Sequence, residues 1–129
     1  MRRNLILLGS FLGFIAIILG AFGAHGLEKV LDAEQIQTFE TGVKYQIYHA
    51  LLLVFLGSQK FTSHKMNNIL FWFILIGVIF FSGSIYGLAT NSLSSFDFKA
   101  IAWITPIGGS LLIVSWLLLF INIFKNRNK

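Results

Sequence analysis

Residues 67–90 read NNILFWFILIGVIFFSGSIYGLAT, a stretch without a single charged side chain. A helix that crosses the hydrocarbon core of a bilayer needs about 20 consecutive apolar residues, because it rises about 1.5 Å per residue. This stretch meets that requirement, and it lies within a longer uncharged segment, residues 66–96. It predicts a transmembrane helix.

Three more segments contain no Asp, Glu, Lys or Arg: residues 4–27, 45–59 and 100–124. The second is the shortest, with a length also typical of interfacial or re-entrant pieces. Lys44 and Lys60 at its ends have long side chains that reach the membrane surface, so the helix can extend to include them. The chain is 56% hydrophobic, with a mean hydropathy of +0.78. We predict a single domain, residues 1–129, with an all-α integral membrane fold and four transmembrane helices at about residues 5–25, 43–59, 67–90 and 100–124.

The charged residues between these segments predict an orientation. All five acidic residues lie in the first and third gaps: Glu28, Asp32, Glu34, Glu40 and Asp97. Seven of the ten Lys and Arg residues lie at the two termini and in the second gap, where there is no acid. Because cytoplasmic loops carry the excess of Lys and Arg, both termini are predicted to be cytoplasmic. Three spans would place the positively charged C-terminal tail outside, against this rule.

The overall charge and the cysteine content exclude some functions. The net charge of +5 reflects the cytoplasmic bias, so it does not indicate a nucleic acid partner. It adds a weak attraction to anionic membrane lipids. No cysteine is present, which excludes disulfides and thiol chemistry. The start of the chain also resembles a cleavable signal peptide, but its apolar run is long for one.

The first gap, residues 26–44, is long enough to fold on its own. Gly26 suits the end of the first helix, and Asp32 and Gln35 have the spacing of a capping box at a helix start. Apolar residues then recur at helical spacing: Ile36, Phe39, Val43 and Ile47. We predict an amphipathic helix at the outer surface, between the first and second spans, that runs into the second span with a bend at Gly42. The alternative is a solvated connector.

Small residues follow one face of the first span: Gly9, Gly13, Ala16, Gly20 and Gly23. Their spacing alternates between four and three, so they form one seam along the helix. Helices in lipid associate where small residues let their backbones approach closely. We predict that this seam makes the first span the packing centre of the four helices. Gly108 and Gly109 offer a similar close approach on the fourth span.

Polar side chains within the spans gather towards the predicted outer leaflet. They are His25, Tyr45, Gln46, His49, Ser82, Tyr86 and Thr105. Tyr45, Gln46 and His49 share one helix face by their spacing, and Pro106 leaves the Ala102 carbonyl without its helical donor. Polar groups at membrane depth usually face neighbouring helices. The set therefore predicts either a small ligand-binding pocket that opens outward or hydrogen bonds between helices, combined with an interfacial aromatic belt.

The chemistry of these residues excludes several kinds of site. A zinc site needs three or four ligands, and no spacing adds Glu28 or Glu40 to His25 and His49, so no metal site is predicted. No nucleophile motif or phosphate-binding glycine loop is present, and we assign no catalytic residue and leave any cofactor unknown. The spans lack Asp and Glu, which argues against a proton-driven antiporter. No ring of charges or filter-like loop indicates an ion channel.

Four short motifs carry a resemblance to a known family. They are GAFGAHG at residues 20–26, TGVKYQIYHA at 41–50, FSGSIY at 81–86 and ITPIGG at 104–109. With these in order over nearly its whole length, the chain resembles the YgdD/YwdK-like family of small bacterial membrane proteins, grouped as domain of unknown function 423. The resemblance implies a four-helix, multi-pass protein of the bacterial inner (cytoplasmic) membrane with no established biochemical activity.

Three hypotheses of function follow. The first is a structural or accessory membrane component that packs with itself, with lipid or with a larger membrane-protein partner. The second is a binding or transport protein whose outer-leaflet pocket holds a small amphiphile, such as a lipid headgroup or a quinone. The third is a membrane enzyme that uses His49 as a general base.

Overall fold

The computed structural model describes residues 1–93, 95 and 97–125, and in this part of the chain it is all helical. The first helix, α1 (Arg2–Ile18), continues through a π-helical turn, η1 (Leu19–Gly23), into a short α2 (Ala24–Leu27). Three more long helices follow, α3 (Ala33–Ser58), α4 (His64–Ala89) and α5 (Ile104–Lys125). Two 3₁₀ turns, η2 (Asn91–Leu93) and η3 (Phe98–Ile101), lie between α4 and α5.

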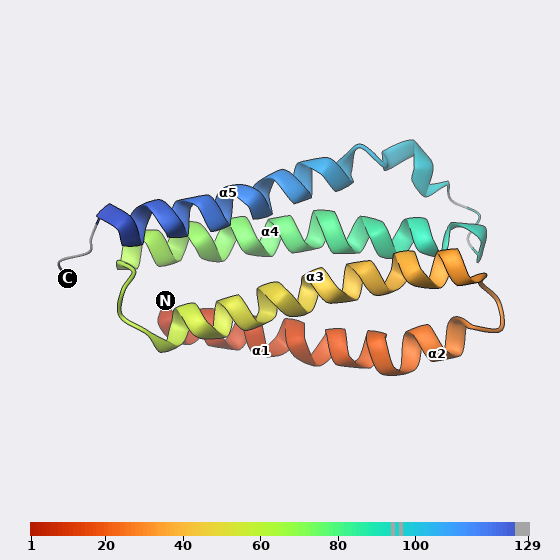
Figure 1. Cartoon of the computed structure of the whole chain (residues 1–129), viewed down its shortest axis with the longest axis horizontal. Coiled ribbons are helices and arrows are strands. Elements are labelled where there is room, and N and C mark those ends of the chain that lie inside the picture. The colour runs from red at the N-terminus through yellow and green to blue at the C-terminus, as the bar shows by residue number, and fades with distance from the viewer. Residues whose placement is uncertain (94, 96, 126–129) are drawn as a thin grey trace.

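The long helices lie side by side and pack in chain order (Figure 1). The main interfaces join α1 to α3, α3 to α4 and α4 to α5, so α3 and α4 are the two inner helices. The start of α1 and the end of α5 lie at the same end of the molecule, whereas α2 and the start of α3 lie at the other (Figure 1). All four helices contribute to one core, in which Leu5, Leu53, Leu70 and Ile74 are fully buried.

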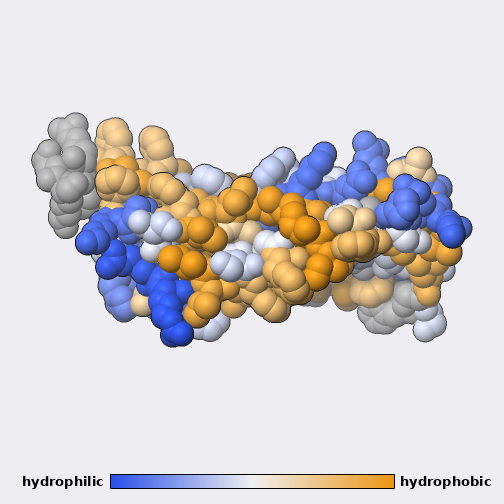
Figure 2. Space-filling view, turned by 90° about the horizontal axis from the view of Figure 1, so that it is seen from below, coloured by the Kyte–Doolittle hydropathy of each residue, from blue (hydrophilic) through white to orange (hydrophobic). Residues whose placement is uncertain are grey.

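The surface of the molecule is that of a membrane protein. On the face drawn in Figure 2, apolar side chains cover the middle and hydrophilic ones gather at both ends. Among the residues that the structure describes, three segments are long and apolar enough to cross a membrane: Arg2–Leu27, His64–Ala89 and Ile104–Lys125. The helix α3 is as long as α4 but is not among them, because the polar residues Tyr45, Gln46, Tyr48 and His49 interrupt its apolar run. The chain is therefore an all-α membrane protein.

The prediction that the first span is the packing centre is wrong. Its seam of small residues faces a single neighbour, α3: Gly9 lies against the Ala50 carbonyl, Gly20 against Val43 and Gly23 against Phe39. Leu5 and Leu12 of α1 are also buried, but much of its remaining surface is exposed, including Phe11 and Phe14. A seam of small residues on one face allows one neighbouring helix to pack closely, but it does not give the helix neighbours on its other faces. The inner positions belong to α3 and α4.

The helix ends agree with the sequence at one point and differ at another. The capping box is confirmed, since the Asp32 backbone N–H donates to Gln35 Oε1 at 2.9 Å and the Gln35 N–H to Asp32 Oδ1 at 2.8 Å. The helix then continues without interruption through Gly42 to Ser58. Gly26 does not end a helix, because α2 continues to Leu27 and the φ of Gly26 is not positive. The chain reverses instead in a turn in which the Leu31 N–H donates to the Leu27 carbonyl at 2.9 Å.

The last helix begins at Ile104 rather than near residue 100, because residues 98–101 form the 3₁₀ turn η3. Pro106 therefore lies in the first turn, where a missing N–H removes no helical hydrogen bond. The Ala102 carbonyl accepts from the Thr105 N–H at 3.2 Å. The expectation that this carbonyl stays free of a helical donor is wrong.

The interface between α4 and α5 generates a prediction about two adjacent glycines. A Cβ atom on Gly108 would lie 2.8 Å from the carbonyl carbon of Phe80, whereas one on Gly109 would meet only the Phe81 ring, at 3.4 Å. Because backbone cannot move aside, we expect Gly108→Ala to lower the free energy of unfolding in detergent by about 1–3 kcal/mol. Gly109→Ala, the matched control, should be neutral or slightly stabilising. Equal losses in both variants would contradict this assignment of the contact.

Candidate functional site

The first polar group inside the helices is centred on Gln46, which is only 4% exposed. Its Nε2 donates to the Leu12 carbonyl of α1 at 2.8 Å, and its Oε1 accepts from the Tyr86 hydroxyl of α4 at 2.6 Å. A carbonyl oxygen has a second lone pair beside the one used in its own helix, so Leu12 can accept this bond. One amide on α3 thus joins α3 to α1 and α4.

The second polar group is centred on His49, which is 3% exposed. The Trp116 indole N–H of α5 donates to His49 Nε2 at 3.0 Å, and His49 Nδ1 lies 2.7 Å from the Tyr45 carbonyl. An indole nitrogen can only donate, so Nε2 must carry the lone pair and Nδ1 the hydrogen. The imidazole is therefore neutral, in the Nδ1–H tautomer, and both of its nitrogens are engaged within the protein.

Two hydroxyl groups make further contacts between helices. The Ser82 hydroxyl of α4 donates to the Gly42 carbonyl of α3 at 2.8 Å. The Ser84 and Thr105 hydroxyls, from α4 and α5, lie 2.5 Å apart. Each of these residues is a small polar group in a segment that is otherwise apolar, and each bond joins a pair of neighbouring helices. They act as contacts between helices rather than as parts of a solvent-filled site.

The seven predicted ligand-binding residues do not surround one cavity. Gln46, Tyr86 and Ser82 lie where α3 meets α4, His49 bonds to α5, the Tyr45 ring packs on Phe81 of α4, and Thr105 pairs with Ser84. His25 stands apart on α2, where its side chain is 82% exposed and Nδ1 lies 3.7 Å from Glu28 Oε2. In the part of the chain that the structure describes, no three His, Asp or Glu side chains lie close enough together to hold a metal ion.

A lateral cavity lies between α3, α4 and α5. It has a volume of about 280 Å³ and a mostly apolar wall, made of Tyr45, His49, Phe81, Gly109, Leu112, Ile113 and Trp116. The Tyr45 ring packs edge-on against Phe81, with centroids 5.0 Å apart. Among its lining residues, Tyr45, His49 and Trp116 carry polar side-chain groups. The arrangement fits a small apolar or weakly amphiphilic group better than a charged one.

Sequence reasoning missed Trp116, the partner that settles the state of His49. The position of Trp116 in the sequence was unusual. Trp in membrane helices is enriched at the membrane interfaces, whereas Trp116 lies well inside the last apolar segment. An indole N–H at that depth needs a hydrogen-bond acceptor. Its own apolar helix offers only backbone carbonyls, and these already accept bonds within the helix. A long-range partner was therefore to be expected, although its identity was not.

The pairing of His49 with Trp116 generates a second prediction. In Trp116→Phe, the Nε2 lone pair loses its donor, and we expect the free energy of unfolding to fall by about 0.6–1.7 kcal/mol, the range measured for such bonds in membranes. Nitrogen NMR of the histidine-labelled wild type should show a hydrogen on Nδ1 and none on Nε2 of His49. Trp103→Phe, which changes an exposed indole, is the matched control. An Nε2–H tautomer in the wild type would contradict the assignment.

Comparison with known proteins agrees with the four motifs. The family model described as "Protein of unknown function (DUF423)" matches residues 19–109. A UPF0382 membrane protein of Staphylococcus saprophyticus is 42% identical over 93% of this chain and 96% of that protein. The UPF0382 membrane protein YwdK of Bacillus subtilis is 36% identical over 93% of this chain and 95% of its own length. The UPF0382 inner membrane protein YgdD of Escherichia coli is 32% identical over 98% and 94%.

No solved structure matches the chain. The family match covers most of the sequence, and each of these relatives is similar over nearly its full length. The resemblance to the YgdD/YwdK-like proteins is thereby confirmed, and the chain belongs to the DUF423 family of membrane proteins of unknown function.

Proposed function

We propose that this protein is a non-catalytic, structural or accessory component of the bacterial inner membrane. The observation that carries the proposal is the state of His49, whose two nitrogens both hydrogen-bond within the protein. A general base needs a free lone pair within reach of a substrate, and the Nε2 lone pair is taken by Trp116. Two more buried polar side chains in the middle of the molecule, Gln46 and Ser82, are likewise used between helices.

Four spans with both termini in the cytoplasm are part of this proposal. The helix α3 has 26 residues, so it is about 39 Å long and exceeds a hydrocarbon core of about 30 Å. Its two most buried polar side chains, Gln46 and His49, are bonded to α1, α4 and α5 and do not face lipid. The excess length belongs to the first turns of α3, where Phe39 is buried and Glu34 and Glu40 are exposed, as an amphipathic segment at the outer surface requires.

The outer helices supply the surface through which such a component would act. Large apolar side chains on α1 and α5 point away from the core, among them Phe11 and Phe14 on α1 and Leu117 and Phe120 on α5. Lipid chains cover such faces at no cost, and so does another apolar helix. The partners proposed are membrane lipids together with a second copy of the chain or a larger membrane protein.

A second candidate function rests on the lateral cavity beside Trp116. Its volume of about 280 Å³ and its apolar wall suit the end of a small amphiphile, such as a quinone ring or part of a lipid. The Tyr45 hydroxyl is the polar group best placed to orient it, because His49 is already occupied. In this alternative the protein binds or transports that molecule.

The topology is tested by labelling single cysteines, because the chain has none of its own. We expect Glu28→Cys and Asp97→Cys to react with a membrane-impermeant maleimide in intact spheroplasts. Lys60→Cys and Lys125→Cys should react only after the membrane is opened, since both lie at the opposite, basic end. These four positions are exposed on the molecule. Reaction of Lys125→Cys from the outside would indicate three spans and overturn this part of the proposal.

The two candidate functions predict different effects of His49→Phe on stability and on a bound small molecule. For a structural component, the protein extracted with its native lipids should carry no stoichiometric small molecule in native mass spectra, and the variant should only unfold more easily. Ile113→Phe, which fills the lateral cavity from its lipid-facing side and leaves His49 bonded, is the matched control. A molecule that is bound one to one in the wild type and lost in both variants would establish the second candidate instead.

A further inference from the structure

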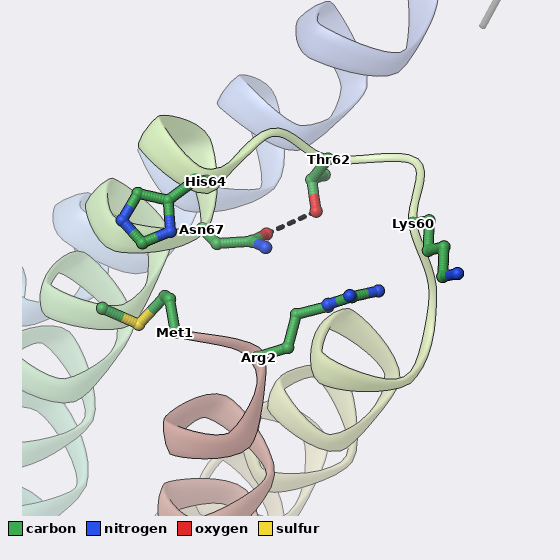
Figure 3. Close-up of a pocket in the computed structure, with 6 residues that line it drawn as sticks. All are labelled: Met1, Arg2, Lys60, Thr62, His64 and Asn67. Atoms are coloured by element: carbon green, nitrogen blue, oxygen red, sulfur yellow. Dashed lines mark hydrogen bonds between the residues drawn. The ribbon is translucent and has the colours of Figure 1, made fainter.

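A second cavity lies at the end of the molecule where α1 begins. It has a volume of about 470 Å³ and is lined by Met1, Arg2, Lys60, Thr62, His64 and Asn67. Figure 3 shows that these residues come from three segments: the start of α1, the connection between α3 and α4, and the first turn of α4. It shares no residue with the polar groups around Gln46 and His49 or with the lateral cavity. The cavity is open, so a ligand can enter without a conformational change.

The charge of this cavity has one sign. Arg2 and Lys60 bring a guanidinium and an ammonium group to its edge, and its lining includes no Asp or Glu. In the part of the chain that the structure describes, neither cation forms a salt bridge. The helices α1 and α4 both begin here, so the positive ends of two helix dipoles add to the same field. The cavity therefore attracts an anion.

Asn67 provides a second, independent feature. It is only 3% exposed, and its Oδ1 accepts from the Thr62 hydroxyl. Thr62 Oγ1 also accepts from Gln59 Nε2 at 3.0 Å, so its hydroxyl hydrogen is free to donate to Asn67. The Asn67 amide is therefore oriented with its oxygen towards Thr62 and its nitrogen away from it. Among the residues that the structure describes, the amide nitrogen of Asn67 donates to no protein group, and in Figure 3 it lies on the side of the cavity that faces Arg2. Because Asn67 lines the cavity, a ligand or water there can accept from this fixed donor.

We propose that this cavity binds the phosphate group of an anionic phospholipid headgroup or of a small soluble phosphate compound. The groups that face the cavity are donors of three kinds: a planar guanidinium, an ammonium and a neutral amide. Arginine binds phosphate through two parallel hydrogen bonds, and lysine adds a point charge. A phosphate has enough oxygens to accept from all three donors at once, and the remaining volume holds a glycerol or sugar group.

The test uses the full chain in neutral detergent at constant ionic strength, with calorimetry as the measurement of binding. One probe is inorganic phosphate, the second is dihexanoyl phosphatidylglycerol, and the uncharged control is dihexanoylglycerol. We expect one site per chain for at least one phosphate probe and none for the uncharged control. Binding of inorganic phosphate identifies a free phosphate compound as the ligand class, and binding of phosphatidylglycerol alone identifies a lipid headgroup.

Matched charge variants distinguish a built site from diffuse attraction. Arg2→Gln with Lys60→Gln removes the cationic side chains of Arg2 and Lys60 from the cavity, whereas Arg3→Gln with Lys65→Gln removes two neighbours that do not line it. We expect the first pair to weaken binding by at least about tenfold, because hydrogen bonds from charged groups are lost, and the second pair to weaken it only slightly. Equal weakening by both pairs, or no binding of either probe to the wild type, would overturn the proposal.

Asn67→Asp tests the amide itself. The aspartate keeps an acceptor for Thr62 but replaces the free donor with a negative charge, so binding should be lost while the melting temperature stays near that of the wild type. If this variant does not fold, the paired charge variants decide the question, since Arg2 and Lys60 are exposed. A folded Asn67→Asp protein that binds as tightly as the wild type would contradict the role of the amide. The cysteine-labelling result is independent of all these outcomes.

Discussion

The structure depends on one constraint, namely that α3 carries polar side chains into an apolar environment and must satisfy them there. Gln46 bonds to α1 and α4, and His49 bonds to α5, so two residues one turn apart join α3 to every other long helix. In lipid, apolar contact between helices adds little, and hydrogen bonds and close packing hold helices together. The residues that make α3 the least apolar of the four helices are therefore the ones that place it in the interior.

The small residues serve this same constraint. Gly42 lies one turn before Gln46 on α3, and a Cβ atom there would lie 2.7 Å from the Tyr86 ring. The absence of a side chain lets the ring pass close to α3, so that its hydroxyl reaches the Gln46 amide at 2.6 Å. Gly77 and Gly108 bring α4 and α5 together in a similar way, which lets the Trp116 indole approach His49. Glycine positions and hydrogen bonds are thus two parts of one packing solution.

Much of the fold could be predicted from the sequence, because it follows from local pattern. Long uncharged segments predicted the helices, and the spacing of Asp32 and Gln35 predicted a capping box that the structure contains. The errors concern relations between helices. The seam on α1 shows which face packs but not how many neighbours pack on it, and His49 and Trp116 are 67 positions apart, so no local pattern links them. The seven polar residues were grouped by expected depth, but hydrogen bonds divide them among separate interfaces.

Polar groups without a hydrogen-bond partner in the protein indicate where a ligand can bind, and they do not lie where the sequence suggested. Sequence reasoning directed attention to the acid-bearing end and to the polar side chains near it, yet five of those side chains hydrogen-bond between helices: Gln46, His49, Ser82, Tyr86 and Thr105. At the basic end, Arg2, Lys60 and the amide nitrogen of Asn67, which have no partner among the residues that the structure describes, share an open cavity. A polar group bonded inside the protein contributes to stability, whereas a fixed donor without a partner remains available to a ligand. The middle of the molecule is therefore built to hold the helices together, and recognition is left to the end where the chain begins.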